Sequence, residues 1–128
     1  MTPAAGDATE EGKAMRQVLL IDLADEAEAI ARYEAWHAAG AVPEAVVQSI
    51  RTARIRDMEI YRTGNRLVMV METEPGFDPA EKAAADAADP AVQAWEQLMD
   101  QFQRPLAWAA ADSKWTAASR IFSLQEQP

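Results

Sequence analysis

The chain has no cysteine and only one histidine among its 128 residues. Without cysteine it can form neither disulfides nor thiolate metal sites, and a single histidine cannot supply a multi-histidine site. Carboxylates alone can hold a hard cation, but no spacing of aspartate and glutamate resembles a calcium-binding loop. A glycine-rich phosphate loop and a dinucleotide fingerprint are also missing. We therefore expect chemistry that needs no metal and no cofactor.

Positive charge is scarce as well. Twelve lysines and arginines stand against 21 acidic residues, for a net charge of -9, and the basic residues form no cluster. Nucleic-acid binding needs the opposite field and is disfavoured. No apolar run reaches the roughly 18 residues of a membrane span, and the N-terminus lacks a charged-then-apolar signal pattern. We expect a soluble cytoplasmic protein without nucleic-acid or membrane partners.

The length of 128 residues and the 49% hydrophobic content fit one globular domain. Residues 1–14 are small, polar and acidic, which is typical of a flexible tail. We expect residues 15–128 to form a single domain.

The order of hydrophobic patterns and turn signals predicts the elements of this domain. Asp25 with Glu28 resembles a capping box, and two Asp-Pro pairs are typical of helix starts. A Gly-Asn pair between two β-branched runs favours a hairpin. The expected elements are a strand over 17–23, a helix from about 25 to 40, a shorter helix from 43, strands over 54–62 and 67–73, helices from 78 and 90, an irregular segment over 104–115 and a final strand over 120–124.

This order is that of an α+β protein, a ferredoxin-like split βαβ sandwich with four antiparallel strands and helices on one face. Residues 67–71 are apolar at every position, so both faces of that strand should be covered. Helices can cover only one of them. We therefore predict a homodimer of the dimeric α/β-barrel type, in which a second copy covers the other face.

His37 is the first candidate for catalysis, because no other side chain of this sequence has an unperturbed pKa near neutrality. Tyr33 lies four residues earlier, which places phenol and imidazole on one face of a helix. A packed histidine beside a packed tyrosine would give the same pattern.

Two other groups of residues could bind a ligand. Trp95 followed by Glu96 pairs an aromatic face with a carboxylate, an arrangement that suits the apolar and hydroxyl faces of a sugar. Trp95 could equally be core, and Glu96 could be solvated. The strand segment 57–62 carries charges among apolar residues, which also fits an edge strand protected against aggregation.

Taken together, these segments resemble the L-rhamnose mutarotase family. The resemblance covers about residues 15–124 and is closer to members associated with L-fucose. The segments that carry it are Tyr-Glu-Ala-Trp-His at 33–37, Pro-Glu at 43–44, Glu-Ile-Tyr at 59–61, Val-Gln-Ala-Trp-Glu-Gln-Leu-Met at 92–99, Phe-Gln-Arg-Pro-Leu at 102–106, Lys-Trp at 114–115 and Ile-Phe-Ser-Leu at 121–124.

The resemblance implies a dimeric ferredoxin-like enzyme, an isomerase that interconverts the α and β anomers of a 6-deoxy sugar without a cofactor. It implies that His37 is the proton donor and that Tyr33 contacts the monosaccharide. A Trp-Trp pair that binds sugar in the rhamnose enzymes reads Trp95-Glu96 here. A substrate-contacting tyrosine aligns with Met58, and Tyr61 matches a nearby aromatic residue. These departures point away from L-rhamnose and towards L-fucose.

Mutarotation needs an acid at the ring oxygen and a base at the anomeric hydroxyl. With one histidine, the complementary group must be a carboxylate, a tyrosine or water, and Glu96, Asp57 and Glu59 are the carboxylate candidates. Two other classes share the expected fold: a dimeric α/β-barrel monooxygenase and a non-catalytic regulatory or stress-response dimer.

Overall fold

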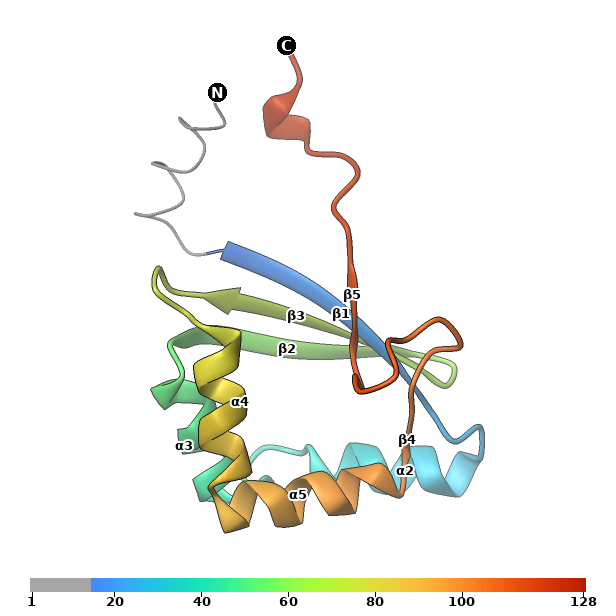
Figure 1. Cartoon of the computed structure of the whole chain (residues 1–128). Helices are drawn as coiled ribbons and strands as arrows, with labels where there is room; N and C mark the ends of the chain where they lie inside the picture. The colour runs from blue at the N-terminus through green and yellow to red at the C-terminus, as the bar shows by residue number, and fades with distance from the viewer. Residues whose placement is uncertain (1–14) are drawn as a thin grey trace.

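The computed structural model describes residues 15–128, so the predicted tail over 1–14 lies outside the described residues. A five-stranded sheet carries four helices (Figure 1). In chain order the elements are β1 (Met15–Leu23), α2 (Ala27–Trp36), α3 (Glu44–Thr52), β2 (Ile55–Thr63), β3 (Arg66–Thr73), α4 (Pro79–Ala87), α5 (Pro90–Asp100), β4 (Gln103–Arg104), β5 (Thr116–Ala118) and a short 3-10 turn, η1 (Leu124–Glu126).

The sheet has the strand order β2-β3-β1-β4, with β5 also paired to β1, and every pairing is antiparallel. This order, with the helices on one side of the sheet (Figure 1), confirms the predicted α+β, ferredoxin-like architecture. The long strand β3 pairs with both β1 and β2, and β4 lies on the far edge of β1.

The core lies between the sheet and the pair α2 and α5. Leu67 of β3 stands opposite Ile21 of β1, and both side chains are fully buried. Because side chains alternate along a strand, this pair identifies which face of the sheet turns towards the helices. The buried residues of this cluster are Ile21, Leu23, Tyr33, Leu67, Met99 and Phe102, with Trp95 and Trp115 packed against them.

Aspartate caps begin the last two helices, as the sequence predicts. The carboxylate of Asp78 accepts a hydrogen bond from the Ala80 amide, and that of Asp89 accepts from the Ala91 amide. The predicted capping box of α2 is wrong, because the residue before this helix is Glu26 and its side chain makes no capping bond. The helix starts one residue later than a box on Asp25 requires.

The predicted final strand over 120–124 is also wrong. The strand that pairs with β1 in this region is β5, four residues earlier, and residues 119–123 have no regular structure. The C-terminal segment instead leaves β5 on the side of the sheet away from the helices (Figure 1). Its apolar side chains are open to solvent in one copy of the chain: Ile121 is 96% exposed and Leu124 is 77% exposed. The apolar run over 120–124 is therefore exposed and is not a strand of this sheet.

Among residues 15–128, no helix is both long and apolar enough to cross a membrane.

Candidate active site

His37 is the residue that ends α2. The helix stops at Trp36, short of the predicted end at Gly40, and His37 is its C-terminal cap. The imidazole Nδ1 lies 2.7 Å from the backbone carbonyl oxygen of Tyr33. Since a carbonyl can only accept, Nδ1 carries the proton that it donates, and in the neutral ring Nε2 keeps a lone pair. The helix end thus fixes both the position and the tautomer of the ring.

Two aromatic side chains contact this imidazole, and a third packs behind one of them. The Tyr33 ring stacks on it with centroids 4.3 Å apart, and the Trp95 ring meets it edge-on at 5.4 Å. Trp36 packs edge-on against Trp95 at 6.2 Å. Two helices supply this aromatic cluster, residues 33, 36 and 37 from α2 and residue 95 from α5. His37 is therefore held among aromatic rings at a point where α2 and α5 meet.

The electrostatic setting keeps the ring neutral. Burial lowers the pKa of His37 below its ordinary value of 6.5, and the hydrogen bond to the Tyr33 carbonyl only partly offsets this. At neutral pH the ring is therefore a proton acceptor at Nε2.

Tyr33 has the opposite character. Its side chain is 3% exposed, and its hydroxyl oxygen accepts a hydrogen bond from the Gln103 side-chain amide at 3.1 Å. Burial raises the pKa of the Tyr33 phenol, the bond from Gln103 lowers it in part, and the charge of Glu96 raises it further. The phenol therefore keeps its proton at neutral pH. A proton acceptor and a proton donor lie one helical turn apart, ring against ring.

Glu96 is held by a lysine from the segment that follows β4. The Nζ atom of Lys114 lies 2.5 Å from a carboxylate oxygen of Glu96 and 2.5 Å from one of Asp100. Burial alone would lower the pKa of Lys114, but the hydrogen bonds to Asp100 and Glu96 outweigh it and raise the pKa. Lys114 thus remains a cation and joins the two carboxylates through its ion pairs.

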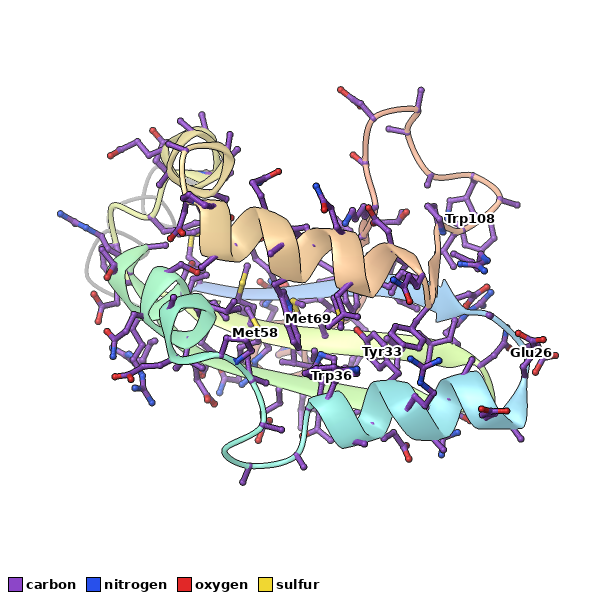
Figure 2. All side chains as sticks on the ribbon, turned by 90° about the horizontal axis from the view of Figure 1, so that it is seen from below. Glu26, Tyr33, Trp36, Met58, Met69 and Trp108 are labelled. Atoms are coloured by element: carbon purple, nitrogen blue, oxygen red, sulfur yellow. The ribbon has the colours of Figure 1, made fainter. Side chains whose placement is uncertain are left out.

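Apolar side chains of the sheet face the same space between the helices. Met69 follows the buried Leu67 by two residues, so it lies on the helix-facing side of β3. Ile60 pairs with Met69, and Met58, two residues earlier on β2, shares that face. Figure 2, viewed from the helix side, shows Met58 and Met69 between α2 and α5, in the same space as Tyr33 and Trp36.

Comparison with known proteins identifies the family of this chain. The sequence model of the L-rhamnose mutarotase family matches residues 16–124. The L-fucose mutarotase of Xanthomonas campestris pv. campestris is 49% identical over 111 residues, which cover 87% of this chain and 89% of that protein. The chain belongs to the L-rhamnose mutarotase family. This confirms the resemblance drawn from the sequence.

The residues for which the family resemblance implies a role lie on two different faces of the sheet. His37, Tyr33 and Trp95 form one cluster, and Met58 faces the same layer. Tyr61 lies on the opposite face of β2, where its hydroxyl donates to the carboxylate of Glu59 at 2.9 Å. A role for Tyr61 in binding stays a prediction, and within one copy of the chain Tyr61 does not reach the cluster.

The same division bears on the candidate carboxylates. Asp57 and Glu59 alternate with Met58 along β2 and so share the outer face with Tyr61. Glu96 is the one of the three candidates whose charge acts on Tyr33. Of the three, it is therefore the carboxylate beside the cluster.

Two residues of this site were not singled out from the sequence. The sequence presents Trp36 only as part of the Tyr33–His37 motif, although its contact with Trp95 completes the aromatic cluster. Gln103 lies in the segment 102–106 that carries the resemblance, where the sequence predicts no role for it, but it belongs to β4 and contacts Tyr33 across 70 residues of chain. Its signal in the sequence was weak, since a single glutamine has no periodicity.

A cavity of about 280 Å³ lies elsewhere, between α3 and the start of α4. Arg54, Asp78 and Lys82 are among the residues that line it, and none of the candidate site residues does. Within residues 15–128, no three His, Cys, Asp or Glu side chains lie close enough together to hold a metal ion.

Proposed function

We propose that this chain interconverts the α and β anomers of L-fucose through the open-chain aldehyde. Family membership makes it a sugar mutarotase, an enzyme of the isomerase class. L-Fucose is the substrate named for the Xanthomonas relative, and a 49% identity over 87% of this chain supports the same substrate here. The observation that carries the mechanism is the neutral His37 ring stacked on the protonated phenol of Tyr33.

In this mechanism His37 Nε2 takes the proton of the anomeric hydroxyl, and the Tyr33 hydroxyl gives a proton to the ring oxygen. The C1–O5 bond breaks, C1 becomes an aldehyde, and the O5 hydroxyl is formed. After rotation about C1–C2, Tyr33 takes back the O5 proton and O5 attacks the other face of the aldehyde. His37 then returns its proton to O1, which is the donor role that the resemblance implies. Each positioned group contributes about 10² to 10⁴ in rate.

The phenol is suited to this step for a chemical reason. A phenol is more acidic than the secondary alcohol that it generates, so transfer to the departing O5 runs downhill. The Gln103 amide, which donates to the phenol oxygen, stabilises the phenolate that forms. Glu96 is ion-paired with Lys114, so we assign it to accepting a hydrogen bond from a sugar hydroxyl.

The surroundings favour a 6-deoxy sugar. The sheet presents Met58 and Met69 to the layer that holds the aromatic cluster (Figure 2), while Glu96 and Gln103 lie near the phenol. A methyl group at C5 matches the apolar side chains, and ring hydroxyls match the polar ones. Flat C–H faces of the ring can pack on Trp95.

Saturation-transfer NMR tests the function directly. Anomeric exchange would be measured at neutral pH with L-fucose, L-rhamnose, D-galactose and D-arabinose, the last having the ring configuration of L-fucose without its methyl group. We expect the fastest exchange with L-fucose and a loss of about fourfold or more with D-arabinose, because one buried methyl contributes about 0.8 kcal/mol or more. Exchange no faster than in buffer with every sugar would refute the proposal.

Replacing Glu96 by glutamine tests its assignment. The amide keeps the size of the carboxylate but loses the charge-assisted hydrogen bond, so we expect exchange of L-fucose to fall about 10-fold. Asp100→Asn is the matched control, since it removes the other partner of Lys114 and should leave exchange within about twofold. Equal losses in the two variants would show that the lysine pairing, and not Glu96, supports activity.

The homodimer is proposed from the exposed apolar surface. Ile121, Phe122 and Leu124 stand open beyond the face of the sheet that carries no helices, together with Tyr61 of β2. A second copy related by a twofold axis would cover this face and these side chains at once. The cytoplasmic location remains a prediction from the sequence.

Phe122→Asp should dissociate this dimer. Phe122 is 64% exposed in one copy, and its burial in a symmetric interface would occur twice, for roughly 3 to 6 kcal/mol per dimer. Light scattering over a concentration series should give twice the chain mass for the unchanged protein and a shift towards the monomer for the variant. A monomeric unchanged protein would contradict the dimer.

A further inference from the structure

Apart from the Tyr33 phenol, the buried polar side chains of residues 15–128 are those of Thr73 and Gln103. Gln103 is 8% exposed, and its amide nitrogen donates to the Tyr33 hydroxyl. Its amide oxygen, also buried, has no hydrogen-bond partner among residues 15–128. A buried acceptor left without a donor costs about 1 to 3 kcal/mol, so native proteins keep few of them.

The unpartnered amide oxygen of Gln103 lies near the two proposed acid–base residues, Tyr33 and His37. Gln103 contacts the hydroxyl of Tyr33, whose ring stacks on His37. Opposite Gln103 on β1 is Leu23, a core residue of the helix-facing side. The other buried oxygen without a hydrogen-bond partner in the described part of the chain is the hydroxyl of Thr116. Thr116 stands opposite Leu20 in the sheet, so its side chain lies on the face away from the helices.

Among residues 15–128, the Gln103–Tyr33 pair has a free hydrogen-bond donor and a free acceptor, which a sugar hydroxyl could contact. Because the phenol oxygen accepts from the amide nitrogen, the phenol proton and the amide oxygen both point to another partner. If the amide were turned over, the phenol would donate to its oxygen and the amide nitrogen would be left without a partner. A sugar hydroxyl can donate to the amide oxygen while the phenol proton is directed to the ring oxygen, and with the amide turned over the same hydroxyl can accept from the amide nitrogen.

We propose that Gln103 is a specificity-determining residue that hydrogen-bonds one secondary hydroxyl of the monosaccharide. This inference rests on the proposed function and adds a polar contact that the sequence did not indicate. The residue acts at the sugar itself and, through its bond to the phenol, also orients Tyr33. Selection follows because an epimer turns the hydroxyl away and leaves the buried amide without its partner.

The test combines one protein change with changes in the sugar. Gln103→Met keeps the length of the side chain and removes its polar atoms. Anomeric exchange would be measured for both proteins with L-fucose and with its 2-, 3- and 4-deoxy derivatives. We expect the variant to lose about 10- to 100-fold with L-fucose, and much less with the one deoxy sugar that lacks the contacted hydroxyl.

Outcomes separate the possible roles. A loss of equal size with all four sugars would overturn the sugar contact and leave Gln103 as a residue that only orients Tyr33 or holds a water molecule. An unchanged rate would overturn both. The exchange catalysed by the unchanged protein tests the mutarotase function by itself; if it is absent, titration of the same four sugars by NMR shift compares binding to the two proteins, with the same pattern expected.

Stability supplies an independent readout and a control. Gln103→Met removes the unpartnered amide oxygen but also the donor to the buried Tyr33 hydroxyl, so the two effects offset one another and the melting temperature should stay within a few degrees, although activity falls. A melting temperature many degrees lower would mark Gln103 as structural, and Gln103→Leu would show whether shape is the cause. Gln101→Met, the same change at an exposed glutamine two residues away, should alter neither activity nor stability.

Discussion

Replacing His37 by asparagine should lower anomeric exchange of L-fucose by about 10² to 10⁴, the contribution of one positioned acid–base group. The asparagine amide nitrogen stands near the position of Nδ1, so it can still donate to the Tyr33 carbonyl and preserve the end of α2. What the variant loses is Nε2, the atom that takes the anomeric proton. Saturation-transfer NMR measures the loss, and circular dichroism and melting temperature show that the fold is kept.

The pH dependence of the same reaction follows from the lowered pKa of His37. The neutral ring is the active base, so kcat/KM should rise with pH through a pKa below 6.5 and level off at neutral pH. The residual rate of His37→Asn should lack this rise. A rate that instead falls as pH increases through this region would show that the protonated ring starts the reaction, with Glu96 or water as the base.

Local sequence signals predict some helices and strands of this fold correctly and fail for others. Alternating and continuous apolar runs predict β1, β2 and β3, and the Asp-Pro pairs predict the starts of α4 and α5, because each signal is local. The run over 120–124 also has the composition of a strand, yet pairing in a sheet depends on a partner edge. Two short strands, β4 and β5, occupy the edge of β1 instead.

The site shows the same limit. Tyr33 and His37 lie one helical turn apart, so helical periodicity predicts that they meet. The separation of Met58 from Tyr61 follows from strand alternation, but only once the buried pair Ile21 and Leu67 shows which face meets the helices. Contacts across the fold, such as Gln103 with Tyr33, depend on packing that no local pattern encodes.

Tyr33→Phe should be the second most damaging change to activity, with a loss of about 100-fold or more in the exchange of L-fucose. Phenylalanine keeps the ring that stacks on His37 and meets Phe102 edge-on, so the cluster retains its packing. The proton donor to O5 is gone. Tyr61→Phe, which changes the other of the two tyrosines, is the matched comparison: Tyr61 lies on the outer face, so its loss of L-fucose exchange should be much smaller than that of Tyr33→Phe and would measure only its predicted binding role.

Loss of the Tyr33 hydroxyl has a second consequence, which separates chemistry from folding. In Tyr33→Phe the Gln103 amide loses its remaining partner, so the free energy of unfolding should fall by about 1 to 3 kcal/mol. Adding Gln103→Met removes the stranded amide, and the double variant should recover most of that stability. Activity should not recover, because neither the proton donor nor the sugar contact returns. Recovery of exchange together with stability would mean that Tyr33 supports the fold and that another group protonates the ring oxygen.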